Sequence, residues 1–211
     1  MKSAVKETAR VRIVDAAVML FWTRGYHPVS TDSICRTAGV KKGSLYFAFP
    51  AKADILMACL GNVGDREWAE MQAIYARQGG IETRFREHLE WYALSQRRLK
   101  EQAGIVLGSF DMALGVAIPD SVVPRMAAYR ALHRSRLDRS IEELLGAGPG
   151  SAVTAGWLAD VVAQLITGAT IRARLGDDLG PLEKLPETVF SLTDAVVSNK
   201  INRNATKRNV G

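Results

Sequence analysis

The chain has 211 residues, of which 28 are Lys or Arg and 22 are Asp or Glu, giving a formal net charge of +6. A content of 47% hydrophobic and 24% charged residues is typical of globular proteins and excludes a disordered chain, a collagen-like chain and a membrane bundle. Ala and Leu, which favour helices most strongly, account for 28 and 20 residues, so we expect an all-α fold of about nine helices.

The cysteine content and the apolar stretches of the sequence indicate in which cellular compartment the protein is expected. Cys35 and Cys59 are too few and too isolated for a disulfide framework or a zinc site, and the polar start of the chain lacks the apolar stretch of a signal peptide. The apolar stretch from Ala152 to Ile171 carries Asp160 and Gln164 in its middle, where a bilayer would penalise them. These features predict a cytoplasmic protein with a buried helix in this stretch, without a membrane partner.

The charge is distributed unevenly along the chain. Residues 1–60 hold nine Lys or Arg and four Asp or Glu, residues 61–198 hold 15 and 18, and residues 199–211 hold four and none. A basic first quarter followed by a slightly acidic middle indicates two units with different purposes, and an anionic partner at the amino end.

The first predicted helix covers residues 7–24. Its apolar residues recur at the spacing of an amphipathic helix, and Gly25 provides the usual C-terminal stop. Arg10, Arg12 and Arg24 lie off the apolar stripe, which consists of Ile13, Ala16, Ala17, Leu20 and Phe21.

Two short helices follow. Ser30 or Thr31 can cap the second helix, which Gly39 ends, and a third helix over Lys42–Phe49 ends before Pro50. Two short helices joined by a tight turn that contains Gly are the helix-turn-helix pattern. Cys35 supplies a small side chain where the two helices cross, and the apolar residues that fill their angle are Ile34, Ala38, Val40, Leu45 and Phe49.

With these features, residues 10–60 resemble the amino-terminal domain of the TetR family of bacterial transcriptional regulators. The resemblance covers about a quarter of the chain; the remainder matches only the overall helical plan of the family. The residues that carry it are the stripe Ala16, Ala17, Leu20 and Phe21, the stop at Gly25, then Thr31, Ile34, Ala38, Gly39 and Val40, the helix start Gly43, Ser44, Leu45 and Tyr46, and its end at Phe49, Pro50 and Lys52.

The resemblance implies that Lys42–Phe49 enters the DNA major groove. The early residues of such a helix read base edges, so Lys42, Ser44 and Leu45 are candidates for base contacts, although Leu45 also fits a purely apolar core position. The phosphate-contact candidates are Thr31, Tyr46 and Lys52, with Lys41 adding charge.

One departure from the family pattern concerns the residues after Tyr46. The family commonly has a further Tyr or His and then a His, whereas this chain has Phe47 and Ala48. Ala48 cannot donate a hydrogen bond to phosphate, which indicates either a different register or a weaker grip on the DNA backbone.

Longer helices are predicted beyond residue 53. Gly and Pro residues separate them, and no β-type alternation competes. Their ranges are 53–77, 81–101, 104–116, 121–146, ended by Gly146, Gly148, Pro149 and Gly150, then 151–175 and 183–200. The expected domains are a DNA-binding domain over residues 1–52, a ligand-binding and dimerisation domain over 53–200, and a frayed basic tail over 201–211.

Large aromatic and Met side chains gather in the predicted fourth to seventh helices. Such residues, with a few polar tips, suit an apolar small-molecule cavity, although each taken singly is more typical of ordinary core. The candidate cavity residues are Trp68, Met71, Tyr75, Trp91, Phe110, Met112, Met126, Tyr129 and His133. His27, His88 and His133 lie too far apart in sequence to predict a metal site, and no cofactor is expected.

The last two predicted helices are apolar around more than one face, so a second surface must cover them. In the family these helices form a four-helix dimer interface, which the resemblance implies here; the alternative is an ordinary monomer core. The candidate interface residues are Leu158, Val162, Leu165, Ile166, Ala169, Leu192 and Val196.

Together these features predict a homodimeric transcriptional regulator that binds a double-stranded DNA operator. The resemblance further implies a repressor that a small, mainly apolar or aromatic effector releases from DNA. The alternatives are a helical small-molecule enzyme, for which the sequence shows no convergent acid, base or nucleophile, and a protein-protein adaptor, which would not need the basic amino-terminal domain.

Overall fold

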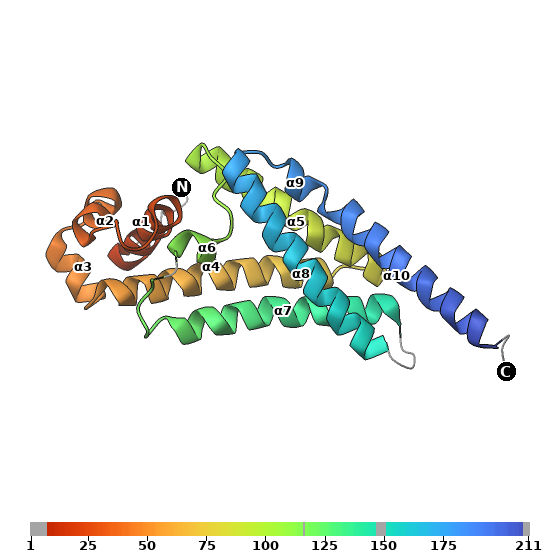
Figure 1. Ribbon diagram of the computed structural model, residues 1–211. Helices are drawn as coiled ribbons and strands as arrows, with labels where there is room; N and C mark the ends of the chain where they lie inside the picture. The colour runs from red at the N-terminus through yellow and green to blue at the C-terminus, as the bar shows by residue number, and fades with distance from the viewer. Residues whose placement is uncertain (1–7, 116, 147–150, 209–211) are drawn as a thin grey trace.

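The computed structural model describes residues 8–115, 117–146 and 151–208, and in the last range it describes the side chains of residues 155–196. Over these residues the chain forms ten α-helices and no strand (Figure 1), which confirms the all-α prediction. The helices are α1 (Ala9–Arg24), α2 (Thr31–Ala38), α3 (Lys42–Ala48), α4 (Lys52–Tyr75), α5 (Ile81–Ala103), α6 (Phe110–Leu114), α7 (Val123–Leu145), α8 (Ser151–Gly176), α9 (Gly180–Glu183) and α10 (Leu185–Arg208).

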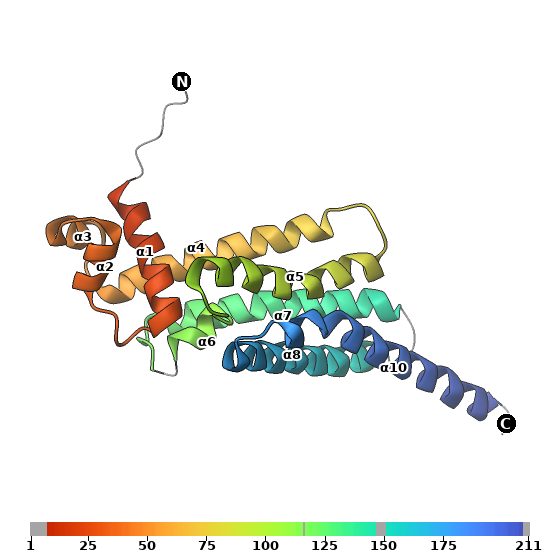
Figure 2. The same ribbon diagram turned by 90° about the horizontal axis from the view of Figure 1, so that it is seen from above.

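The three amino-terminal helices gather at one end of the molecule, and the carboxyl terminus lies at the other (Figure 1). The long helices α4 and α7 run side by side away from the α1–α3 end, and α8 crosses α7. Viewed from above, α5 lies beside α4, and α10 extends past the ends of its neighbours (Figure 2). The long helices therefore connect the amino-terminal helices to the rest of the bundle.

Capping residues set the boundaries of the first helices. Thr8 caps α1 by accepting a hydrogen bond from the Val11 amide, and Ser30 caps α2 by accepting one from the Ser33 amide at 3.1 Å. Gly39 ends α2 with φ of 62°, a left-handed conformation that glycine adopts without steric cost. These local signals are why the predicted positions of the first three helices agree with the structure to within two residues.

Two arginines of α1 hold the short helices in place. Arg10 donates a hydrogen bond to the carbonyl oxygen of Ala48 at the end of α3, at 2.9 Å, and its guanidinium lies 4.1 Å from the centre of the Phe49 ring. Arg12 donates to the carbonyl oxygens of Ala38 and Gly39 at the end of α2, each at 3.3 Å. Carbonyl groups at helix ends lack partners within the helix, so these arginines supply them.

The amino-terminal helices share one hydrophobic core with the rest of the molecule. Leu45 of α3 and Ile34 of α2 are fully buried, and so are Cys59 and other residues of α4. Burial raises the pKa of the Cys59 thiol, which opposes thiolate chemistry there. This core also takes in α6 and the start of α7, through Phe110, Ala113, Leu114, Val122 and Met126.

The predicted helix over residues 104–116 is wrong, because only Phe110–Leu114 are helical. Gly104 and Gly108 both adopt positive φ, 78° and 72°, which ends α5 and keeps the intervening residues out of helix. The Val106 amide instead donates to the Asp177 carboxylate at 2.8 Å, at the end of α8.

The end of the chain also differs from the prediction of one helix over residues 183–200. The structure has a short α9, a break at Lys184 and then α10, which begins beside Pro186 because proline suits the first turn of a helix. No Gly or Pro follows before Arg208, so α10 continues past the predicted end at residue 200. The predicted stops at Gly148, Pro149 and Gly150, and tail residues 209–211, lie outside the described residues.

Among the helices that the structure describes, none is by itself both long enough and apolar enough to cross a membrane. Among these helices, α3 and α4 are long and apolar enough only when taken together, and they are bent by 67° at the break between them.

Replacement of Leu45 by Ala should destabilise the chain by about 2–5 kcal/mol, because Leu45 is fully buried and its loss leaves a cavity. Phe47→Ala is the matched control on the same helix; its ring is 94% exposed, so we expect a change within about 0.5 kcal/mol. Urea unfolding followed by circular dichroism measures both. Equal losses for the two variants would contradict this packing.

Candidate nucleic-acid interface and ligand cavity

The surface of α3 that faces solvent consists of polar and aromatic side chains. Lys42, Ser44, Tyr46 and Phe47 are all exposed, and the Phe47 ring is almost fully so. Leu45 is fully buried in the core, so its predicted role in reading bases is wrong: its side chain faces the opposite side of the helix. Lys42 and Ser44 remain as the exposed candidates of the early part of the helix.

The starts of α2 and α3 are tied together by polar contacts. The Lys42 ammonium lies 2.8 Å from the Asp32 carboxylate, which accepts its hydrogen bond and raises the pKa of Lys42. The Thr31 hydroxyl and the Tyr46 hydroxyl are 3.3 Å apart. The structure thus places three predicted DNA-contacting residues, Thr31, Lys42 and Tyr46, on one surface.

Lys52 lies at the start of α4. Its ammonium is 4.1 Å from the centre of the Tyr26 ring and donates to the His27 carbonyl oxygen at 3.3 Å. Partial burial lowers the pKa of Lys52. These contacts hold the loop between α1 and α2 against α4, and Lys41 occupies the N-cap position of α3.

Residues from α4 to α8 line a cavity of about 460 Å³ that is partly open to solvent. Four of the predicted cavity residues line it: Trp91, Met112, Tyr129 and His133. The other lining residues, which the sequence analysis did not predict for the cavity, are Glu67, Tyr92, Ser95, Gln96, Ser109, Asp111, Arg130, Arg134, Leu137, Ala163, Ile166, Thr167 and Thr170.

The other five predicted cavity residues lie elsewhere. Phe110 and Met126 belong to the core around α1, so their aromatic and thioether groups fill space instead of lining it. Trp68, Met71 and Tyr75 do not line the cavity but pack in a cluster with the cavity residue Trp91, and Trp68 and Tyr75 also pack against the guanidinium of Arg136. Side-chain type alone did not distinguish cavity wall from core.

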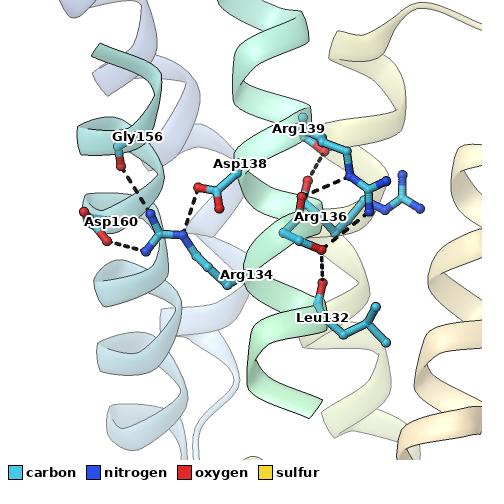
Figure 3. Close-up of polar contacts among 9 residues, drawn as sticks. Leu132, Arg134, Arg136, Asp138, Arg139, Gly156 and Asp160 are labelled. Carbon is cyan, nitrogen blue, oxygen red and sulfur yellow. Dashed lines mark hydrogen bonds and ion pairs between the residues drawn. The ribbon is translucent and has the colours of Figure 1, made fainter. Parts of the chain in front are cut away.

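The polar part of the cavity wall contains two carboxyl groups with different partners. Glu67 of α4 accepts a hydrogen bond from the Tyr129 hydroxyl, and burial raises the pKa of Glu67 to about 7 despite that bond. Asp111 forms an ion pair with Arg130 at 2.8 Å. Arg134 of α7 is likewise paired, to Asp138 on its own helix at 2.9 Å and to Asp160 on α8 (Figure 3).

A buried histidine supports the cavity wall from behind. His88 is fully buried and stacks on Tyr92 with ring centres 5.6 Å apart. Its Nδ1 lies 2.9 Å from the Tyr75 hydroxyl, which in turn contacts the Ser140 hydroxyl at 2.6 Å. Burial lowers the pKa of His88 to about 3, so the imidazole is neutral at physiological pH.

A chain of hydrogen bonds connects the cavity to α1. Gln96, which lines the cavity, donates to the Gly108 carbonyl oxygen and accepts from the Gly108 amide, both at 2.8 Å. The same carbonyl oxygen accepts the indole N–H of Trp22 at 2.9 Å, and Trp22 packs edge-on against Phe110. The segment from Gly108 to Phe110 is thus fixed from both sides.

Residues 13–59 match the family model described as "Bacterial regulatory proteins, tetR family". These residues of the amino-terminal domain therefore form a TetR-family DNA-binding domain. The HTH-type transcriptional regulator SrpR of Pseudomonas putida is 38% identical over 60 residues, 28% of each chain. TtgW, an uncharacterized HTH-type transcriptional regulator that also comes from Pseudomonas putida, is 42% identical over 57 residues, 27% of this chain and 42% of the relative. The chain therefore matches less than half of the length of these curated relatives, which are named as regulators and not as enzymes.

Solved structures of TetR-family regulators share the fold over most of this chain. One from Legionella pneumophila has a TM-score of 0.75 at 19% identity, covering 89% of this chain and 98% of the other. One from Agrobacterium tumefaciens has a TM-score of 0.74 at 17% identity, covering 87% and 96%. The shared helical plan thus extends well beyond the matched amino-terminal domain.

The apolar residues exposed on α8 are not the residues that the sequence analysis predicted for a dimer interface. Leu158, Val162 and Ile166 are buried in the core of the chain itself, so they leave no surface for a second copy, and this part of the prediction is wrong. Leu165, Ala169, Leu192 and Val196 are partly buried. The exposed apolar side chains on α8 are Trp157, Ile171 and Leu175.

Within the described residues, no group of three or more His, Cys, Asp or Glu side chains could hold a metal ion. His27 contacts the Ala117 carbonyl oxygen, His88 lies in the buried network, and His133 lines the cavity. His27 lies apart from the other two, whereas His133 is close enough to His88 to add to the effect of burial in lowering the pKa of His88.

The buried His88 should make the stability of this chain fall with acidification. Burial lowers the pKa of His88 in the folded chain, so below about pH 6.5 the unfolded chain binds a proton that the folded chain does not bind. The free energy of unfolding therefore decreases by about 1.4 kcal/mol for each pH unit of acidification. Urea unfolding between pH 7 and pH 5 should show a steeper loss for the wild type than for His88→Gln. Glu67 titrates in both proteins and cancels in the difference. Identical slopes would show that His88 carries no such linkage.

Proposed function

We propose that the chain is a dimeric, sequence-specific DNA-binding transcriptional regulator, and that it acts as a repressor which a small, mainly apolar or aromatic effector releases from its operator. In this proposal residues 1–52 read DNA and residues 53–200 bind the effector and pair two copies. The observation that carries it is the exposed polar and aromatic face of α3 on a TetR-family helix-turn-helix.

The α3 helix presents suitable groups for the major groove. A helix fits this groove and reads base edges with its early residues, a role for Lys42 and Ser44. In this proposal Thr31, Lys41, Tyr46 and Lys52 contact phosphates, supported by the 3.3 Å separation of the Thr31 and Tyr46 hydroxyls beside the start of α3. Because Asp32 is exposed and pairs with Lys42, a DNA phosphate can compete with this carboxylate for the ammonium.

Ala48 leaves the end of α3 without a donor for phosphate. Arg10 lies beside that position, since it donates to the Ala48 carbonyl oxygen and remains exposed. A guanidinium has five N–H donors, so the ones not engaged by Ala48 are available to a phosphate. In this proposal Arg10 takes over the backbone contact that the residue at position 48 cannot make.

Pairing would use the exposed face of α8. Trp157 and Leu175 are 53% and 83% exposed, and apolar side chains of this size along one helix favour burial against a second copy. A two-fold dimer places two recognition helices about 34–36 Å apart, one turn of DNA. Dimerisation thereby doubles the number of base contacts.

The effector would act through the elements that connect the cavity to α1. Glu67 lies on α4, whose first residue Lys52 holds the loop before α2, and Gln96 fixes Gly108, which accepts the Trp22 indole N–H. A ligand that displaces α4 or the Gly108 segment changes the position of the amino-terminal helices. It can do so only if it binds the non-DNA state better, by a few kcal/mol.

A gel-shift titration with the promoter DNA upstream of its own gene tests DNA binding. The wild type should bind this DNA in preference to an unrelated fragment, with affinity falling as salt increases, because bound phosphates release counterions. Lys42→Ala with Tyr46→Ala should weaken binding at least about tenfold, corresponding to the loss of base and phosphate contacts. Glu142→Gln, an exposed substitution on α7, serves as control.

The alternatives give different results in the same experiment. An adaptor or a helical enzyme would show no preference for the promoter fragment, and the double variant would behave like the wild type. Turnover of a small molecule that a cavity substitution abolishes would favour the enzyme.

Light scattering tests the dimer. The wild type should have twice the chain mass of 23.0 kDa, and Trp157→Glu with Leu175→Glu should give the monomer mass, because two charges would be buried in the interface. Val123→Glu, an exposed apolar position on α7, is the control and should remain dimeric. A wild type of 23.0 kDa at micromolar concentration would overturn the pairing.

A further inference from the structure

We propose that the cavity is built for a bulky apolar or aromatic monocation, with the Glu67 carboxylate as its counter-ion. The inference deepens the proposed function, on which it rests for the regulatory consequence, by assigning a charge to the effector. It stands on the arrangement of charged and aromatic groups around the cavity.

Glu67 is the one acid in the cavity wall that no cation neutralises. Within the described residues, its hydrogen-bond partner is the Tyr129 hydroxyl, and no Lys or Arg lies within ion-pair distance of it. Asp111 is matched by Arg130, and Arg134 is matched by Asp138 and Asp160 (Figure 3). A buried carboxylate without a counter-ion is costly, so a cationic ligand stabilises it.

Aromatic residues line the same cavity as Glu67. Trp91, Tyr92 and Tyr129 all line the cavity with Glu67, and Trp91 and Tyr92 meet edge to face with ring centres 5.1 Å apart. His133 lies 4.6 Å from Tyr129, centre to centre, and burial lowers the pKa of His133, so this ring adds no competing positive charge. Ring faces attract cations, most strongly when the site is desolvated.

Glu67 also borders a second, smaller cavity. This cavity of about 130 Å³, between α4 and α5, shares Glu67, Trp91 and Ser95 with the first. Its rim holds Glu70, which accepts hydrogen bonds from the Trp91 indole N–H at 2.6 Å and from Arg98 at 2.7 Å.

The proton state of Glu67 couples binding to pH. The charged and titratable groups around it are Arg66 and Glu70 on α4, Tyr92 on α5, Asp111 on α6, and Tyr129 and Arg130 on α7. Burial outweighs the Tyr129 hydrogen bond and Arg66, and raises the pKa of Glu67 to about 7. A bound cation favours the carboxylate, so binding near neutral pH releases a proton, and affinity rises with pH.

A pair of probes with nearly the same size and shape but opposite charge tests the proposal. Tetraphenylphosphonium is a bulky aromatic cation, and tetraphenylborate is its anionic counterpart. Titration calorimetry on the full chain at pH 8 should show the cation binding at least about tenfold more tightly than the anion. Between pH 6 and pH 8 the cation affinity should increase, and buffers of different ionisation enthalpy should reveal proton release near pH 7.

Glu67→Gln isolates the carboxylate while keeping its size and an acceptor for Tyr129. This variant should lose about tenfold or more in affinity for the cation and lose the pH dependence, without weakening the anion. Glu90→Gln removes the same charge from an exposed site on α5 and should behave like the wild type. Thermal unfolding confirms that both variants fold; if Glu67→Gln does not, the pH dependence and the proton release of the wild type decide the question alone.

The outcomes separate this inference from the proposed function. Equal binding of the two probes, preference for the anion, absence of binding by the cation, or an unchanged affinity in a folded Glu67→Gln overturns the cation site, even if the chain binds its promoter. Selective binding of the cation without any effect on promoter binding supports the cation site and overturns effector-controlled release instead.

Discussion

The packing of α1 is the constraint on which the rest of the structure depends. This helix buries residues on more than one face: Ile13 and Ala17 are fully buried, and so, almost entirely, is Trp22. The small helices α2 and α3 cover part of its surface, while α4 and α6 cover another. A helix buried in this way cannot move alone, so any displacement of α4 or α6 is transmitted to the amino-terminal helices.

Hydrogen bonds also connect α1 to the cavity wall. The Gly108 backbone is held by both ends of the Gln96 amide, and its carbonyl oxygen also accepts the Trp22 indole N–H. Hydrogen bonds of this kind are costly to leave unmade in a buried place, so the three groups move together or break together. The connection places a cavity-lining residue two hydrogen bonds away from the core of α1.

The charged side chains of the bundle and those of α1 have different kinds of partner. In the body of the bundle, ion pairs such as Arg134 with Asp160 and Arg97 with Glu183 connect neighbouring helices on the surface. In the amino-terminal helices, Arg10 and Arg12 bind helix ends, which leaves the exposed surface of α3 basic and aromatic. Glu67 has neither a cationic partner nor a helix end as partner, and this carboxyl group without a counter-ion, in a cavity lined by aromatic residues, distinguishes the site from ordinary core.

Local chemistry in the sequence determined the amino-terminal helices, the helix-turn-helix and its family, because caps such as Ser30 and turns such as Gly39 act between residues close in the chain. Only the tertiary structure decided between a core position and a base contact for Leu45, and showed that residues 104–109 are not helical and that Leu158, Val162 and Ile166 face inward. The cavity is the clearest case. Glu67, Asp111 and Tyr129 come from three helices, and the space between them exists only because those helices pack imperfectly at that level. Sequence periodicity tells which face of a helix is apolar, whereas the partner that covers each part of that face depends on contacts between residues far apart in the chain.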